Sequence, residues 1–188
     1  MSTLPPLSTP DPLNTEATRF GIDRRMCVAA NRWGTRRTVG AFFSAISRLG
    51  DGVFWYGLMG IIALLGGWRG CLVAAQMALT GLSALLLYRL LKRWTRRPRP
   101  FRACPGVIAH IPPLDEFSFP SGHTLQAMSF TIVALAWYPM LAPVLVPFTA
   151  LVAASRVVLG LHYPSDVLAA LAIGGTLGLT SLYLFPPS

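Results

Sequence analysis

Hydrophobic residues gather in five segments that polar or proline-containing stretches separate: 53–68, 70–91, 122–142, 143–161 and 165–185. A membrane-spanning helix needs about 20 mainly apolar residues. The first segment is short for this purpose, and we expect it to extend back through Gly52 toward Phe42. The pattern predicts an all-α fold, a polytopic membrane helical bundle of five to six transmembrane helices.

The chain before these segments differs in character. Residues 1–18 are polar and rich in proline, which predicts a disordered tail. Residues 19–50 mix apolar side chains with arginines, which is typical of amphipathic interfacial helices at a membrane surface. A solvated basic tail is the alternative interpretation. The sequence does not decide whether 19–50 crosses the membrane, and 51–188 forms the predicted transmembrane domain.

Composition supports a membrane protein. Only 12% of the 188 residues are charged, against roughly 25% in an ordinary soluble domain. The formal net charge is +9, which suits an anionic substrate or the lipid bilayer itself. The apolar runs are too long for a soluble nucleic-acid reader, so no nucleic-acid partner is expected. The three cysteines are spaced neither for a disulfide framework nor for a zinc site.

Three polar clusters stand apart from this apolar background. They are Lys92-Arg-Trp-Thr-Arg-Arg-Pro-Arg99-Pro100, then Pro120-Ser121-Gly122-His123, then Ser155-Arg156 followed by His162 and Asp166. The second apolar segment ends just before the first cluster, and the third segment starts within the second cluster. The fourth segment then returns to the same side, so all three clusters are predicted to meet at one membrane face.

The residue types in these clusters suit phosphate chemistry. Lys92, Arg99 and Arg156 supply three cations, and guanidinium groups match phosphate oxygens. Ser121 and the Gly122 amide stand where a helix begins, and a helix N-terminus binds anions.

The two histidines of these clusters add reactive groups. Either His123 or His162 can act as nucleophile while the other transfers a proton. Asp166 follows His162 by four residues and is placed to hold its ring in one tautomer. His110, by contrast, is interpreted as structural. The remaining basic residues of the loop are interpreted as a lipid-headgroup face: Arg93, Arg96, Arg97 and Arg102.

Taken together, the clusters resemble the type 2 phosphatidic acid phosphatase superfamily, membrane relatives of the vanadium haloperoxidases. The family pattern is Lys-x6-Arg-Pro, Pro-Ser-Gly-His and Ser-Arg-x5-His-x3-Asp, and the chain matches it over about residues 85–180. The resemblance implies that His162 is the nucleophile, that Asp166 orients it and that His123 is the general acid and later the base. It assigns phosphate binding to Lys92, Arg99, Ser121, Gly122 and Arg156. It implies no metal and no cofactor.

The function expected from this resemblance is hydrolysis of a lipid phosphate or diphosphate through a phosphohistidine intermediate. The substrate would be of the undecaprenyl diphosphate, phosphatidylglycerol phosphate or phosphatidate type. One alternative is phosphoryl transfer to lipid A or a glycan, and another is a non-catalytic anionic-lipid binder. The sequence identifies neither the natural lipid nor the oligomeric state.

The expected location is the bacterial inner membrane. The positive-inside rule would place the basic face in the cytoplasm, whereas many bacterial members of the family act on the outer face. We favour the periplasmic side for the active site.

Overall fold

A computed structural model describes residues 12–187 of the chain, with side chains from Gly21 onward. Every regular element in this part is helical, which confirms the predicted all-α bundle. In order, the elements are α1 (Pro12–Gly34), α2 (Arg37–Arg48), the π-helical turn η1 (Leu49–Val53), α3 (Phe54–Leu65), α4 (Gly67–Thr95), α5 (Pro100–Ala103), α6 (Gly122–Trp137), the 3-10 turn η2 (Pro139–Leu141), α7 (Ala142–Val158) and α8 (Pro164–Leu184).

Four helical stretches in the described part are long and apolar enough to cross a membrane. They are Arg37–Leu65, Gly67–Ala103, Pro139–Val158 and Pro164–Leu184. The predicted segment 122–142 instead divides into α6, with 16 residues, and the turn η2. Proline at position 139 explains the break, because its ring disfavours helix at the preceding residue.

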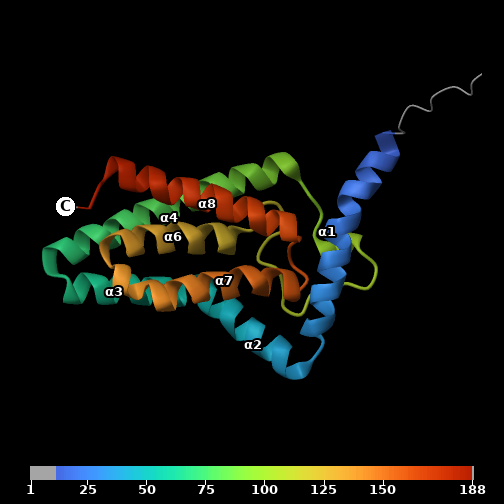
Figure 1. The fold of residues 1–188 in the computed structure, drawn as a ribbon, viewed down its shortest axis with the longest axis horizontal. Coiled ribbons are helices and arrows are strands. Elements are labelled where there is room, and N and C mark those ends of the chain that lie inside the picture. Colours follow the sequence, from blue (N-terminus) through green and yellow to red (C-terminus); the bar gives the residue numbers. More distant parts are fainter. Residues whose placement is uncertain (1–11, 188) are drawn as a thin grey trace, which may run out of the picture.

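Helix α6 occupies the middle of the bundle. Figure 1 shows it running between α4, α7 and α8, and it packs against each of them. Its sequence is apolar or small on nearly every side, and Leu125, Phe130 and Val133 are fully or almost fully buried. A helix without a polar face is stable only when neighbours surround it. The central position of α6 fixes its N-terminus at the point where the polar clusters meet.

The outer surface of the bundle is apolar. Large hydrophobic side chains point outward from α3, α4 and α8, among them Leu64, Leu86 and Leu179, which are 84%, 60% and 62% exposed. A soluble protein rarely exposes apolar side chains over so wide an area. The lipid bilayer is the environment that such a surface fits.

The N-terminal region is held against the bundle by specific contacts. Of the predicted tail 1–18, residues 1–11 lie outside the described part and the remainder begins α1, where Pro12 suits a first helical turn. Figure 1 shows α1 (blue) lying across one end of the bundle. Asn31 donates to the carbonyl oxygens of Ile108 (2.9 Å) and Val158 (3.0 Å), which anchors α1 to the loop and to α7.

Residues 37–50, predicted to lie at the membrane surface, form part of a candidate span. The reason is that α2 and α3 follow each other directly through η1, so Arg37–Leu65 forms one long stretch with a kink. Gly52 in η1 has φ 134°, in the left-handed region that glycine adopts without strain, and the chain is kinked at this point.

The contact between α6 and α8 depends on glycine. A methyl group added at Gly174 would overlap the carbonyl oxygen of Leu125, which belongs to the backbone and cannot turn away. We expect Gly174→Ala to destabilise the protein, because overpacking costs about 1–3 kcal/mol and exceeds the helix propensity that alanine gains. The thermal unfolding midpoint in detergent measures this loss.

Gly175 is the matched control on the same helix. Its added methyl group would lie 3.9 Å from its nearest neighbours, Ile132 and Met128, so Gly175→Ala should leave the midpoint unchanged or raise it. Equal midpoints for the two variants would show that close approach of α6 and α8 does not limit stability.

Candidate active site

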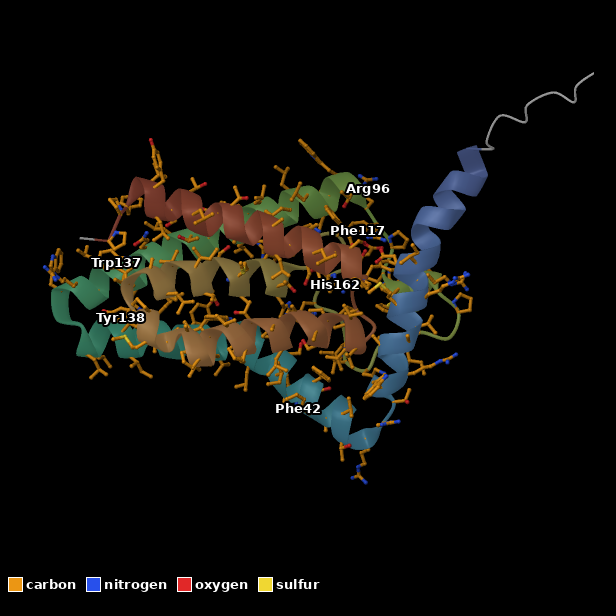
Figure 2. All side chains as sticks on the ribbon, in the orientation of Figure 1. Phe42, Arg96, Phe117, Trp137, Tyr138 and His162 are labelled. Carbon is orange, nitrogen blue, oxygen red and sulfur yellow. The ribbon has the colours of Figure 1, made fainter. Side chains whose placement is uncertain are left out.

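A cavity of about 200 Å³ lies between η1, α3, α4, α6, α7 and the loop 104–121. Figure 2 shows His162 and Phe117 near the end of the bundle crossed by α1, with Trp137 and Tyr138 at the other end. The structure brings the three sequence clusters together here. Six of the eight predicted site residues line the cavity: Lys92, Arg99, Gly122, His123, Arg156 and His162.

The ring of His162 is held in one orientation. Its Nδ1 lies 2.6 Å from the carbonyl oxygen of Ser118, and because a carbonyl only accepts, Nδ1 carries the proton. Nε2 therefore keeps a lone pair, and the Nη1 of Arg99 stands 3.3 Å away to donate to it. His162 is 1% exposed, yet it lines the cavity.

The same surroundings favour a neutral imidazole. Burial, together with the positive charges of Arg156 and Arg99, lowers the pKa of His162 well below its ordinary value. A neutral ring with an unprotonated nitrogen at a cavity is the form in which histidine is a nucleophile.

Asp166 lies behind His162 and does not line the cavity. Its Oδ2 is 3.7 Å from His162 Nδ1, beyond hydrogen-bond distance, and accepts a hydrogen bond from the Tyr163 amide at 2.9 Å. Its Oδ1 accepts from Arg97 at 2.6 Å. The carboxylate thus acts on the imidazole through its charge, while the Ser118 carbonyl makes the hydrogen bond expected of Asp166.

Arg97 is a structural partner of the site. Its side chain is 17% exposed and forms ion pairs with Asp23 of α1 at 2.7 Å and with Asp166 at 2.6 Å. It also stacks on the Tyr163 ring, 4.0 Å from the centroid. The expectation that Arg97 belongs to a headgroup face is wrong, because two carboxylates hold it inside the protein.

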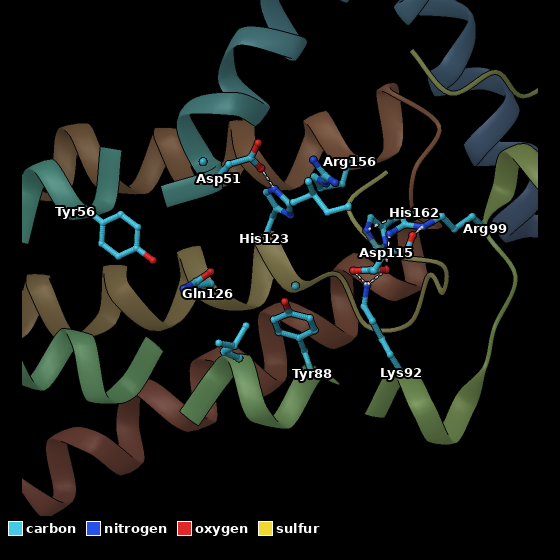
Figure 3. Close-up of a pocket in the computed structure, with 14 residues that line it drawn as sticks. Asp51, Tyr56, Tyr88, Lys92, Arg99, Asp115, His123, Gln126, Arg156 and His162 are labelled. Atoms are coloured by element: carbon cyan, nitrogen blue, oxygen red, sulfur yellow. Dashed lines mark hydrogen bonds and ion pairs between the residues drawn. The ribbon is translucent and has the colours of Figure 1, made fainter. Parts of the chain in front are cut away.

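Lys92 and Arg99 share one carboxylate, as Figure 3 shows. Lys92 Nζ donates to both oxygens of Asp115 at 2.6 and 2.7 Å, and Arg99 Nη2 donates to Oδ1 at 2.7 Å. Burial opposes ionisation of Asp115, but the hydrogen bond and charge of Lys92, with those of Arg99, hold its pKa below the ordinary value. The Asp115 carboxylate, itself an anion with two oxygens, is therefore already bound to these two cations.

Arg156 brings a third cation to the cavity. It is 2% exposed, and its Nη1 donates to Ser47 Oγ on α2. Its Nε is one of three buried side-chain nitrogens in the described part that lack a hydrogen-bond partner. An unpaired donor on a buried guanidinium is costly, and an anion in the cavity would supply the missing acceptor.

The N-terminus of α6 completes the cavity. Ser121 stands at the cap position but makes no capping bond, because its hydroxyl is paired with Thr124 Oγ1 at 2.9 Å. Gly122 and His123 line the cavity as the first residues of the helix. The first amide groups of a helix have no intrahelical partners and favour negative charge. Both Ser121 and Gly122 were predicted to bind phosphate, but of the two only Gly122 lines the cavity.

His123 has a partner that the sequence interpretation missed. Its Nε2 is bonded to Oδ1 of Asp51, which η1 carries to the cavity from the opposite side (Figure 3). Ser47 and Asp115 were missed as well. The signal available for Asp115 was its position as one of only two acids in a strongly basic loop.

Fold and site together define a multi-pass membrane protein with a cationic, histidine-containing cavity at one end of the helical bundle. The family model described as the PAP2 superfamily matches residues 70–188, and the chain belongs to this superfamily. The resemblance inferred from the motifs is confirmed.

The chain is also similar in sequence to individual named phosphatases. The chain is 40% identical over 122 residues to the decaprenylphosphoryl-5-phosphoribose phosphatase of Mycobacterium tuberculosis, a match that covers 64% of each protein. It is 36% identical over 100 residues to the undecaprenyl-diphosphatase BcrC of Bacillus subtilis, over 53% of this chain and 51% of that one. The match thus spans about half to two thirds of the length of these relatives.

A solved structure shares the fold. The transmembrane PAP2-type phosphatidylglycerolphosphate phosphatase from Bacillus subtilis superposes with a TM-score of 0.71 at 25% identity. The superposition covers 89% of this chain and 86% of that chain.

The pairing of Asp115 with Lys92 and Arg99 predicts a change in anion affinity. In Asp115→Asn the cavity keeps its three cations and loses the carboxylate that occupies two of them. We expect inorganic phosphate to bind at least about 10-fold more tightly, because a hydrogen bond to a charged group contributes about 1.5–3 kcal/mol. Isothermal titration calorimetry in detergent measures the affinity.

Glu116→Gln is the matched control for this change. It removes the same charge one residue further on, where the side chain is 66% exposed and pairs with Arg102 at 3.4 Å outside the cavity. Its phosphate affinity should equal that of the wild type. Weaker binding by Asp115→Asn would show that Asp115 organises the cations rather than competing with phosphate.

Proposed function

We propose that the chain is a lipid phosphatase that hydrolyses a membrane-lipid phosphate or diphosphate through a phosphohistidine at His162. The observation that carries this proposal is the unprotonated Nε2 of His162 at a cavity where Lys92, Arg99 and Arg156 converge. Binding an anion requires the cations alone. A neutral histidine with a fixed tautomer among them supports a chemical step.

In the first step, the Nε2 lone pair of His162 forms a bond to phosphorus while the bond to the leaving oxygen breaks. The electron pair of that bond stays on the leaving oxygen, which takes a proton from His123. Lys92, Arg99, Arg156 and the N-terminus of α6 stabilise the charge on the other phosphoryl oxygens.

The phosphorylated imidazole carries a positive charge, since both of its nitrogens are then substituted. The Ser118 carbonyl at 2.6 Å and the Asp166 carboxylate at 3.7 Å from Nδ1 offset this charge. In the second step, a water molecule loses a proton to His123 and attacks phosphorus. The nitrogen–phosphorus bond breaks, its electron pair returns to Nε2, and phosphate is released.

The substrate class follows from the cavity and from the relatives. The cations recognise the phosphate group, while Tyr56, Leu85 and Tyr88 give one wall of the cavity an apolar or aromatic character. Two of the named relatives act, by their names, on polyprenyl-linked phosphates. We therefore place polyprenyl phosphates and diphosphates first, ahead of phosphatidylglycerol phosphate and phosphatidate.

The same proposal places the protein in the bacterial inner membrane, with the cavity on the periplasmic side. The positive-inside rule counts lysine and arginine near helix ends. Lys92, Arg97 and Arg99 are bound to carboxylates here, so their ion pairs inside the protein, and not topology, account for them. Without these residues the basic bias of this face is weaker evidence for a cytoplasmic location.

The proposal predicts metal-independent phosphate release. Purified protein in detergent with EDTA should release phosphate from at least one of undecaprenyl diphosphate, phosphatidylglycerol phosphate, phosphatidate and lipid A. His162→Ala should lower the rate by at least about 10³-fold, because the nucleophile is lost. An alkaline quench should trap labelled phosphate on the wild type and not on the variant.

His110→Ala is the matched control, since His110 lies outside the cavity lining and should keep the wild-type rate. Survival of activity in His162→Ala would exclude His162 as the nucleophile. Release that appears only when an acceptor lipid or glycan is added would identify a phosphotransferase. Lipid binding without release from any substrate would identify a non-catalytic binder.

The lowered pKa of His162 sets the pH dependence. Attack requires the neutral ring, so activity is present above the pKa of the folded protein and is lost as the pH falls through it. The acid limb of kcat/KM, which reports the free enzyme, should therefore have its midpoint below 6.5, the ordinary value for histidine. Because the substrate phosphate also ionises, it is titrated separately and its contribution is removed from the profile. A corrected midpoint at or above 6.5 would contradict the argument that burial lowers the pKa of His162.

A further inference from the structure

The cations of the cavity create a difficulty for His123. A general acid must be protonated before it can give its proton to a leaving group. The positive groups that face His123 are Arg156 from α7 and Lys92 from α4, with His162 on the adjoining wall. Burial and like charges both disfavour the protonated ring, so the groups that bind phosphate also reduce the protonated fraction of His123 that the reaction needs.

Asp51 supplies the opposing charge. Its Oδ1 is bonded to Nε2 of His123, and both side chains line the cavity. A carboxylate accepts hydrogen bonds only, so Nε2 carries a proton and Nδ1 is the nitrogen left to face the leaving oxygen. The same contact stabilises the doubly protonated ring, as a carboxylate does for the base of a catalytic triad.

The segment that carries Asp51 is fixed in place. Gly52 adopts φ 134°, which turns the chain between α2 and α3. Gly50 lies directly against α7, since a methyl group added there would meet Val152 Cγ2 at 3.0 Å. One helical turn earlier, Ser47 accepts a hydrogen bond from Arg156. Ser47 and Asp51 thus approach the cavity from one side, and each holds a cavity residue.

We propose that Asp51 is a positioning residue that orients His123 and stabilises its protonated form for transfer to the leaving oxygen. The inference rests on the proposed phosphatase function. In the transfer, the Nδ1–H bond of His123 breaks and an O–H bond forms as the bond from phosphorus to the leaving oxygen breaks. Asp51 lies outside residues 70–188, which the family model matches, so none of the three motifs contains it.

Leaving-group dependence tests this role. An alkyl alkoxide needs a proton in order to leave, whereas nitrophenolate leaves without one. We expect Asp51→Asn to lower kcat/KM at least about 10²-fold for an alkyl phosphate, the lower end of what general acid catalysis contributes. For 4-nitrophenyl phosphate in the same detergent, the loss should be less than about 5-fold. Asp51→Glu, which keeps the charge, should retain most of the alkyl phosphate activity.

His123→Ala should show the same selectivity, and the double variant Asp51→Asn/His123→Ala should lose no more than His123→Ala alone. Calorimetry with inorganic phosphate checks that the cations of the Asp51→Asn variant still bind an anion.

An equal loss on both substrates, with an active wild type, would overturn the role of Asp51 and leave the phosphatase function standing. If the wild type binds phosphate and hydrolyses neither these two substrates nor any lipid of the panel above, the proposed function is wrong and the role of Asp51 falls with it.

Discussion

Charge compensation within an apolar bundle is the constraint on which this site depends. Lys92, Arg99 and Arg156 are 5%, 1% and 2% exposed at one end of a membrane protein. A buried ion without a partner costs several kcal/mol, and three like charges together cost more. Lys92 and Arg99 accordingly meet the carboxylate of Asp115, whereas Arg156 meets the neutral hydroxyl of Ser47 and keeps an unpaired Nε. The positions of the acids follow from those of the cations.

The acceptors lie on elements of different rigidity, and this difference affects how a ligand can enter the cavity. Ser47 and Asp51 belong to the helical stretch Arg37–Leu65, which is kinked at Gly52, whereas Asp115 lies in the loop between α5 and α6 and is 36% exposed. A carboxylate on an exposed loop can leave its cations at a smaller cost than one on a packed helix. We therefore expect a phosphate of higher charge to replace Asp115 while the other contacts stay in place.

Much of the fold and part of the site could be predicted from the sequence. Long apolar runs encode spanning helices, and counting crossings placed His162 and His123 at the same end as Arg99. The Ser118 carbonyl could not be predicted, because every residue carries one and only the folded loop decides which one meets His162. Arg97 was misread because its partners, Asp23 and Asp166, are 143 residues apart in the chain and meet only through the docking of α1.

Two parts of the chain contribute different groups to the site. Residues 70–188, which the family model matches, hold the cations and both histidines. The preceding segment contributes Asp51 to His123, Ser47 to Arg156 and, through Arg97, Asp23 to the surroundings of Asp166. Changes in this segment would alter the charge around His123 and His162 while every motif residue stays the same. Under the proposed function, such changes would alter which leaving groups this chain can expel.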